Sequence, residues 1–478
     1  MERRATMSNQ SNPDSNANQD FFELPIKSLI FLIKRLKLKD LLIKNITDPR
    51  SPLSRKYDLY SLLMMALSTS FFRSSSKNEF HLNFQRNDIP KAFLKFVEMD
   101  SKTIPCVRTI DDLLLKIDPK ELEDILPSIF KTLIESKLFQ LHPELKRDGA
   151  FCFALDAHTS HCYHENSQHP CEMCSYCMKR THGNKTYYLH TEVILSFIAP
   201  NGLQIPILIH RMEGNPKWNG LSEKKLKQEC ELTAFPIVMK KLRELFPRLR
   251  IHLLLDALYC NDPVFTLLGE LKISFSIVKK PKVLKTVGED CEGLRKLIKP
   301  ISRTYSNNRF DVVQSIQFFN DIAYRSHKLS VIQVDEKATK KPSKRFAKVH
   351  IKESRWEWIE STEVTAENAT KKADGNRLRW YEEDLFNTAE NRGFNMQHDF
   401  GRAPKVQTIW LYFILIAMTL TALLEYSSLG RIFNKKSLKF VMKQMLEHLL
   451  YLNEIKIFSD NFPGQLRFGA PEPPVSFS

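Results

Sequence analysis

The sequence lacks several features that would assign a chain to a class directly. We expect no signal peptide at its start, no internal repeat runs along it, and residues 21–145 show no zinc-finger or recognition-helix signature. One long uncharged run occurs, the 17 residues Thr408–Leu424. This length is at the short limit for a membrane-spanning helix, and no second run accompanies it. We therefore expect a buried core helix in a protein that has no membrane partner.

Acidic residues are fewer than basic ones. The 71 lysines and arginines exceed the 55 aspartates and glutamates, which leaves a net charge of +16 and a pI near 9.3. A polyanion such as DNA would release counterions on binding such a surface. An anionic membrane, or no charged partner at all, remains an alternative from charge alone. The nine cysteines are an odd number and predict a reduced cytosolic protein rather than a disulfide framework.

Composition and hydrophobic periodicity divide the chain into a helical part, a mixed part and two tails. The Asn/Ser-rich start predicts a disordered tail, and the following apolar 3–4 spacings predict a helical domain. That domain would bind DNA ends or dimerise, with a plain helical cap as the alternative. The expected parts are a tail at 1–20, the helical domain at 21–145, a core at 146–280 and 362–455, a β-rich insertion at 281–361, and a tail at 456–478.

Two aspartates follow apolar strands of the expected core. The predicted order is strand, strand, strand, helix, strand, over Phe151–Leu155, Tyr187–Ala199, Leu203–His210, Ser222–Phe246 and Arg250–Leu255. Asp156 follows the first strand and Asp256 follows the fourth. If these strands are parallel neighbours, both carboxylates lie at one end of the sheet. Carboxylates so placed suit Mg²⁺ or Mn²⁺, although a single aspartate at a strand end is commonly a loop cap.

The run from Asn376 to Gly401 resembles the C-terminal signature of insertion-sequence transposases of the DDE type. In that family an arginine precedes the catalytic glutamate by four residues, and Arg379 and Glu383 fit this spacing on one helix face. Glu382 remains a rival for the same role. Further motifs of the family occur in the same order, and the resemblance covers roughly residues 55–430. They are Leu155-Asp156, Cys171-Glu-Met-Cys174, Thr186–His190, Lys227–Glu231 and Leu255–Tyr259.

The resemblance implies an α/β protein whose ribonuclease-H-like mixed sheet is flanked by helices, with a helical N-terminal domain and a β-rich insertion. It implies an enzyme that cuts element ends and joins them to target DNA. Asp156, Asp256 and Glu383 would hold two Mg²⁺ or Mn²⁺ ions for phosphodiester hydrolysis and transesterification. The expected partners are double-stranded DNA, both terminal inverted repeats and target, and a second copy on the DNA. The expected location is the cytoplasm, at the nucleoid.

Two positions depart from the signature. Its tyrosine falls at Asn376 and its lysine at Glu390. An anion in place of a cation weakens contacts with DNA phosphate. The alternative function is therefore a degenerate or repurposed transposase that binds DNA without strand transfer. No serine or tyrosine recombinase motif is present, which agrees with a reaction that forms no covalent protein–DNA intermediate.

The expected DNA contacts come from the signature, a basic stretch and two tryptophans. Lysines in such a stretch are also common on ordinary solvated faces, and the two tryptophans fit either a flipped base or one face of an ordinary strand. The predicted contact residues are Arg379, Lys279, Lys280, Lys282, Trp356, Trp358 and His398.

A cluster of soft metal ligands follows the first strand. The Cys-x2-Cys spacing suits a tetrahedral structural zinc, and the predicted ligands are Cys171, Cys174, Cys177 and His182. A loop with reduced thiols is the alternative. His158 and His161 lie close to Asp156 in sequence, and we expect them near substrate or around the metal ligands.

Overall fold

A computed structural model describes most of the chain, in ten ranges. These are residues 25–85, 90–101, 103–136, 139, 142–164, 174–214, 222–306, 310–341, 350–427 and 437–451, so the tails expected at 1–20 and 456–478 lie outside them. Contacts divide the chain into two compact units. The first unit comprises Met1–Leu122, Asn391–Gly401 and Thr408–Phe468, and the second comprises Glu123–Glu390, Arg402–Gln407 and Gly469–Ser478.

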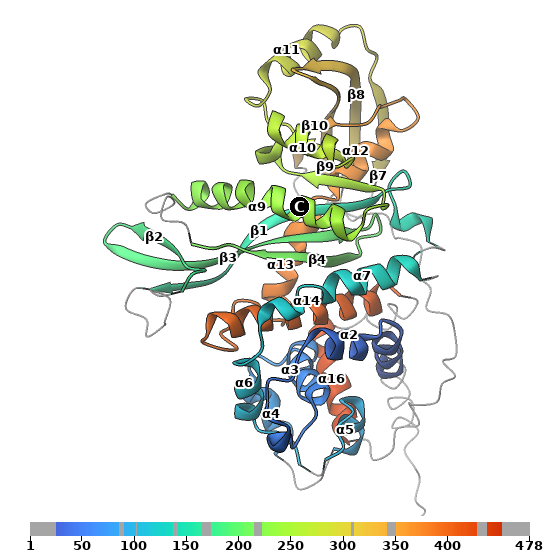
Figure 1. Cartoon of the computed structure of the whole chain (residues 1–478). Coiled ribbons are helices and arrows are strands. Elements are labelled where there is room, and N and C mark those ends of the chain that lie inside the picture. The colour runs from blue at the N-terminus through green and yellow to red at the C-terminus, as the bar shows by residue number, and fades with distance from the viewer. Residues whose placement is uncertain are drawn as a thin grey trace, which may run out of the picture. The chain divides into compact units, whose positions relative to one another are not determined.

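The second unit is built on one mixed sheet of ten strands (Figure 1). The order is β2-β3-β1-β5-β6-β10-β9-β8-β7, and β4 also pairs with β3. The strands are β1 Phe151–His164, β2 Met178–His182, β3 Lys185–Ile198, β4 Gln204–Arg211, β5 Ile251–Leu255, β6 Ser274–Val278, β7 Ile301–Ser306, β8 Phe310–Tyr324, β9 His327–Lys340 and β10 Ile351–Glu360. With its flanking helices, this sheet makes the protein mixed α/β, as the sequence predicts.

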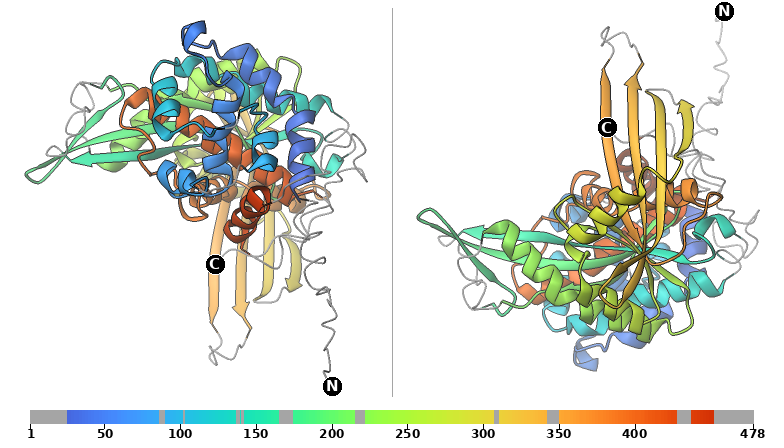
Figure 2. Two further views of the ribbon diagram at one scale, coloured as in Figure 1. Left: turned by 90° about the horizontal axis from the view of Figure 1, so that it is seen from below. Right: turned by 90° about the horizontal axis from the view of Figure 1, so that it is seen from above.

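Parallel pairing occurs at the middle of the sheet. β5 lies parallel to β1 and to β6, whereas β1, β3 and β4 pair antiparallel. The predicted parallel pairing of the first and fourth core strands is therefore confirmed. β5 is buried along its whole length, as expected for a strand covered on both faces. β1 and β3 run on as a long pair that ends with β2 in a projecting hairpin (Figures 1 and 2).

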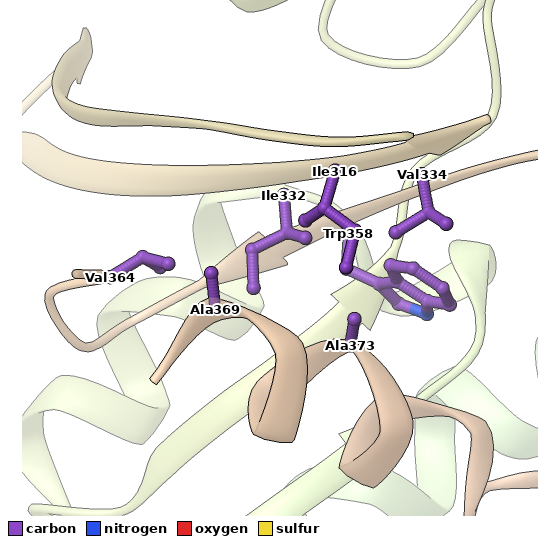
Figure 3. Packing of buried hydrophobic residues seen from close by; sticks show 7 residues of the cluster. All are labelled: Ile316, Ile332, Val334, Trp358, Val364, Ala369 and Ala373. Carbon is purple, nitrogen blue, oxygen red and sulfur yellow. The ribbon is translucent and has the colours of Figure 1, made fainter. Parts of the chain in front are cut away.

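The β-rich segment continues the same sheet. β7, β8, β9 and β10 form antiparallel pairs and run side by side (Figure 2), and β10 pairs with β6 of the core. The expected insertion at 281–361 thus contains strands, but it also contains the helix α11 (Lys285–Leu294), which alternation did not predict. One face of these strands packs on α12 (Ala369–Arg377) through the cluster in Figure 3: Ile316, Ile332, Val334, Trp358, Val364, Ala369 and Ala373.

Helices cover the sheet within the second unit. α7 (Ile125–Glu135) contacts β4, and α9 (Glu223–Leu245) contacts β1, β3 and β4. α10 (Asp262–Glu270) contacts β6, and α11 contacts β8. α13 (Trp380–Asn391) follows α12 and carries the transposase-like signature. Two short 3-10 turns, Pro143–Leu145 and Ala257–Tyr259, also occur among the described residues of this unit.

The first unit is helical. Its most buried helix is α3 (Leu59–Phe71), whose N-terminus is capped by Asp58 accepting from the Ser61 backbone N–H at 3.0 Å. Around it are α2 Leu38–Asn45, α4 Lys77–Leu82, α5 Lys91–Phe96, α6 Val107–Leu114 and α16 Leu438–Tyr451. The contact division ends the N-terminal part of this unit at Leu122 and groups Thr408–Phe468 with it.

α14 (Pro404–Glu425) contains the uncharged run. In the part of the chain that the structure describes, it is the one helix long and apolar enough to cross a membrane, and 94% of its apolar window is buried. Such burial is consistent with the expected core helix.

Candidate active site

The two aspartates are placed by the parallel pair β1 and β5. Phe151 pairs with Ile251 and Ala154 with Leu254, so partners differ by 100 in residue number. Continuing this register by two residues sets Asp156 beside Asp256, on neighbouring strands roughly 5 Å apart and on the same face. Asp156 lies inside β1, which continues to His164, whereas Asp256 directly follows β5. Both residues are half-buried.

A buried tyrosine lies close to both aspartates. Tyr259 is fully buried and donates a hydrogen bond from its hydroxyl to Oε2 of Glu231 on α9 at 3.1 Å. Burial raises the pKa of Tyr259 well above 10, and the negative charges of Glu231, Asp256 and Asp156 raise it further. The sequence did not single out Glu231 or Tyr259 for a role. The signal was there in Leu255–Tyr259 and Lys227–Glu231, two of the motifs shared with the resembled family.

Glu382 is the acidic residue of α13 that faces the core. It is fully buried, and Ser196 on β3 donates to its Oε1 at 3.0 Å. Its Oε2 is buried and has no hydrogen-bond partner among the described residues. Burial raises the pKa of Glu382 well above 4.5, with the charge of Asp156 as the next cause. Glu382 is therefore close enough to Asp156 for their charges to interact.

Glu383 occupies the exposed side of the same helix. Its side chain is 45% exposed and its Oε1 accepts from Arg379 at 2.9 Å, the pairing that the four-residue spacing predicts. The buried residues of α13 are Glu382, Leu385, Phe386 and Ala389, which are spaced by three or four positions. The helix phase thus directs Glu382, and not Glu383, toward the strand that carries Asp156.

Glu390 is paired with a histidine of β1. Its Oε1 lies 3.0 Å from Nε2 of His158, whose ring stacks on Phe386 at 4.6 Å. Glu382, Phe386 and Glu390 are successive steps of four along α13. The anion that replaces the signature's lysine is therefore matched by an imidazole two residues after Asp156. His161 lies further along β1, with its ring 5.9 Å from that of Tyr163.

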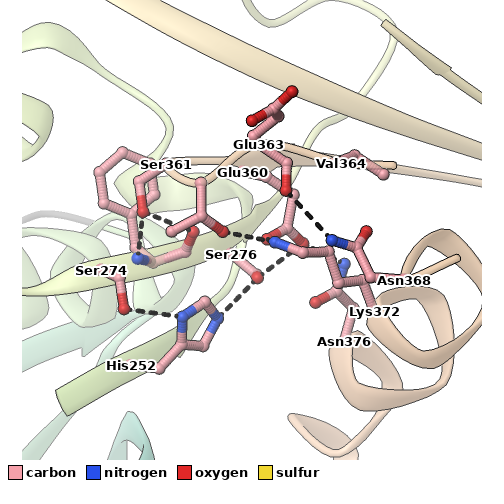
Figure 4. Close-up of polar contacts among 12 residues, drawn as sticks. His252, Ser274, Ser276, Glu360, Ser361, Glu363, Val364, Asn368, Lys372 and Asn376 are labelled. Carbon is pink, nitrogen blue, oxygen red and sulfur yellow. Dashed lines mark hydrogen bonds and ion pairs between the residues drawn. The ribbon is translucent and has the colours of Figure 1, made fainter. Parts of the chain in front are cut away.

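Asn376, the other departure, belongs to a buried polar network. Its Oδ1 accepts from Arg147 at 2.7 Å and its Nδ2 donates to Glu360 at 2.6 Å. Figure 4 shows it beside Ser276 and His252, and the Ser276 hydroxyl also donates to Glu360 at 2.7 Å. Each of these side chains is buried, so the asparagine adds hydrogen bonds to a polar network that lies inside the fold.

The two tryptophans of β10 occupy different environments. Trp358 is 3% exposed and packs in the cluster of Figure 3. It therefore belongs to the packed face of an ordinary strand, the alternative to stacking on a flipped base. The half-buried Trp356 stacks on it at 6.3 Å and meets the ring of Trp380 edge to face at 6.3 Å. Trp380 is 40% exposed and lies under the guanidinium of Arg379. Trp380 is thus the exposed ring of this group, and no sequence signal had distinguished it.

The predicted DNA-contact lysines separate in the same way. Lys279 is 5% exposed and its Nζ lies 3.1 Å from Glu357, so this cation is neutralised inside the fold. Lys280 and Lys282 are exposed. His398 is exposed too, and it belongs to the first unit.

The cysteine cluster gathers around a histidine that the sequence interpretation did not include. Cys174, Cys177 and His190 place their ligand atoms within 4.8 Å of one another. Cys171 lies outside the described residues. His182 is the last residue of β2, five positions beyond Cys177 in the sequence. The missed signal was the hairpin register: Met178 pairs with Leu189, so the preceding Cys177 falls opposite His190.

Comparison of the sequence with known protein-family models and with curated proteins found no match. The resemblance to DDE transposases therefore stays a prediction, and a function has to be inferred from the arrangement of the site residues.

Proposed function

We propose that the chain is a DDE-type transposase whose carboxylates are Asp156, Asp256 and Glu382. The observation that carries the proposal is the β1–β5 register, which sets the two aspartates side by side, with the buried Glu382 interacting with Asp156. This assignment replaces Glu383, the choice from spacing alone, with its neighbour. Glu383 is already paired with Arg379 on the exposed side of the helix.

The carboxylates suit hard divalent cations such as Mg²⁺ or Mn²⁺. The buried Oε2 of Glu382 has no hydrogen-bond partner among the described residues, and a cation would satisfy it. Asp156, Asp256 and Glu382 would hold the ions. Bound there, two ions would supply Lewis-acid activation of the attacking oxygen and stabilisation of the leaving oxygen.

The surrounding residues hold this site in place. Ser196 fixes one oxygen of Glu382, and the Asp256 carboxylate accepts from the Leu258 backbone N–H at 2.7 Å, which sets its rotamer. His158 and Glu390 join β1 to the last turn of α13. Through this contact the helix that carries Glu382 is tied to the strand that carries Asp156.

The strand arrangement supports a ribonuclease-H-like core. Three antiparallel strands, β4, β3 and β1, are followed across the sheet by the parallel β5 and β6, with helices alongside. The net charge of +16 and the exposed Lys280 and Lys282 favour double-stranded DNA as the partner. Two element ends must be brought together for strand transfer, which argues for two copies of the chain on the DNA. The DNA would be that of the nucleoid, in the cytoplasm.

Cleavage and joining of labelled duplexes tests the proposal. The duplexes would carry the DNA sequences that flank the coding region on each side, with plasmid DNA as target and Mn²⁺ as the metal. We expect nicked and joined products from the wild type and from Glu383→Gln. We expect neither product from Asp156→Asn, Asp256→Asn or Glu382→Gln.

Each other outcome points to a different function. Nicking without joined product would indicate a nuclease. A wild type that shifts DNA on a gel but is as inert as Asp156→Asn would indicate the DNA-binding alternative. Activity that survives in Glu382→Gln and disappears in Glu383→Gln would return the third carboxylate to Glu383.

A further inference from the structure

We propose that Cys174, Cys177 and His190 bind a structural zinc ion at the base of the projecting hairpin formed by β1, β2 and β3. This site is separate from the carboxylates. His190 pairs with His161 across the β1–β3 ladder, whereas Asp156 pairs with Ile194. The offset along the strands is four to five residues, or roughly 15 Å, so the two sites do not share an ion.

The three ligand atoms lie within a few tenths of an ångström of the spacing that tetrahedral zinc requires, as two of their distances show. Nε2 of His190 lies 3.0 Å from Sγ of Cys177 and 3.6 Å from Sγ of Cys174. Zinc bonds of about 2.3 Å to sulfur and 2.0 Å to nitrogen put tetrahedral ligand atoms about 3.5–3.8 Å apart. Small side-chain rotations therefore bring the three atoms into coordination distance. Cys174 and Cys177 are half-buried, so solvent can supply a fourth ligand.

The backbone holds the two cysteines in a tight turn. The Cys177 N–H donates to the Cys174 carbonyl at 3.2 Å, which closes the turn just before β2. Gly214, after β4, donates its N–H to the Ser175 carbonyl at 2.7 Å. A Cβ at Gly214 would overlap the Cys177 carbonyl oxygen, so only glycine allows this approach. The turn is thus fixed against β4 independently of any metal.

Two side chains contact Nδ1 of the His190 ring, and they decide which ring nitrogen carries the proton. Nδ1 lies 2.9 Å from Oε1 of Gln407 and 2.8 Å from Nη2 of Arg211. In a neutral ring, Nδ1 either donates to Gln407 or accepts from Arg211. Metal on Nε2 requires the proton on Nδ1, so the Gln407 contact is the one that fits zinc. The Gln407 amide is itself oriented, since its Nε2 donates to Tyr163 at 2.6 Å.

A zinc ion here would join the turn before β2 to β3. The long β1–β3 pair continues into this hairpin, and the contacts of Gln407 and Arg211 connect His190 to the first turn of α14 and the end of β4. One ion would therefore fix the direction in which the hairpin leaves the sheet.

Zinc content of the purified full-length chain tests the site. We expect about one equivalent in the wild type, and on replacement by Co²⁺ a tetrahedral d–d spectrum with a thiolate-to-cobalt charge-transfer band. Cys174→Ser, Cys177→Ser and His190→Ala should lose the metal. The matched controls Cys162→Ser, with an exposed thiol on β1, and His164→Ala should keep it.

Two further variants keep the test decisive if a ligand variant does not fold. Gln407→Ala leaves all three ligands in place and should weaken zinc binding about 10- to 100-fold through loss of the Nδ1 contact. Asp156→Asn should retain full zinc, so failure of the transposase proposal and failure of this one are distinguishable. A wild type without zinc or a cobalt–thiolate band, a Cys174–Cys177 disulfide in its place, or zinc retained in Cys177→Ser would overturn the site.

Discussion

Replacing Glu382 by glutamine, with Glu383→Gln as its matched control, separates the two adjacent glutamates of α13. Glutamine preserves the shape of the side chain and the contact with Ser196, and it removes the charge. Glu382 is fully buried with Oε2 unpaired among the described residues, whereas the Glu383 side chain is 45% exposed. The first change therefore alters the buried carboxylate that we propose as a cation ligand, and the second alters a surface ion pair worth about 0.3–0.5 kcal/mol.

The magnitude follows from metal binding to the folded state alone. At a Mn²⁺ concentration of 100 times Kd, a site absent from the unfolded chain adds about 2.7 kcal/mol to stability. For a unit of this size, 1 kcal/mol raises Tm by about 2 °C, so the expected shift is about 5 °C. We expect this shift in the wild type and in Glu383→Gln, and little or none in Glu382→Gln, by thermal denaturation during a Mn²⁺ titration.

The pH dependence of stability, measured without metal in EDTA, tests the same residue. Because the folded pKa of Glu382 is raised, its folded form holds a proton that the unfolded form has released above pH 4.5. Stability of the wild type should then fall as pH rises from 4.5, by up to about 1.4 kcal/mol per pH unit, until the folded pKa is reached. Glu382→Gln should lack this loss. Equal Mn²⁺ shifts in the wild type and Glu382→Gln, or parallel pH curves, would refute the reasoning.

Three further changes test the fold around the site. Burial lowers the pKa of His252 well below 6.5, so the wild type should lose up to about 1.4 kcal/mol per pH unit below 6.5 relative to His252→Gln, measured by urea denaturation; parallel curves would contradict a neutral buried ring. Trp358→Ala should cost about 3–5 kcal/mol, and Trp356→Ala only about 1–2 kcal/mol, in the same assay, and a reversed order would place the core elsewhere. Gly375→Ala should cost about 1–3 kcal/mol, because the new Cβ would lie 2.9 Å from Nε of Arg147, which its hydrogen bonds hold in place; an unchanged Tm would mean that this arginine moves freely.

The placement of the aspartates was predictable because it depends on strand order. Apolar strands that end at Asp156 and Asp256, separated by a hairpin and a helix, leave few arrangements of the sheet, and the β1–β5 pairing is the expected one. The hairpin at Pro200-Asn201-Gly202 was predictable too, because the residues of the turn itself favour it.

The choice between Glu382 and Glu383 was not predictable from spacing. The four-residue spacing predicted that Arg379 and Glu383 lie on the same side, and the two side chains do form an ion pair. It does not fix which face packs on the sheet, because that depends on the whole apolar set of α13. Leu385, Phe386 and Ala389 are buried with Glu382, and that pattern decides the phase.

The remaining features of the site depend on contacts between residues that are far apart in the sequence. His190 joins Cys177 only through the β2–β3 register, and Asn376 meets Arg147 from 229 positions away. Lys279 looked like part of a basic surface because its partner, Glu357, lies 78 positions further along. Sequence proximity does not report such contacts, so buried and exposed cations look alike until the sheet is formed.

The pairing of β10 with β6 also protects the core from self-association. Glu360, Ile359 and Trp358 occupy the edge of β6 opposite Ser276, Ile277 and Val278. A chain shortened between β6 and α12 would leave these backbone groups open beside an apolar strand, as a template for pairing with a second chain. The β-rich segment therefore covers this edge of the sheet, and its deletion should produce aggregates rather than a smaller folded chain.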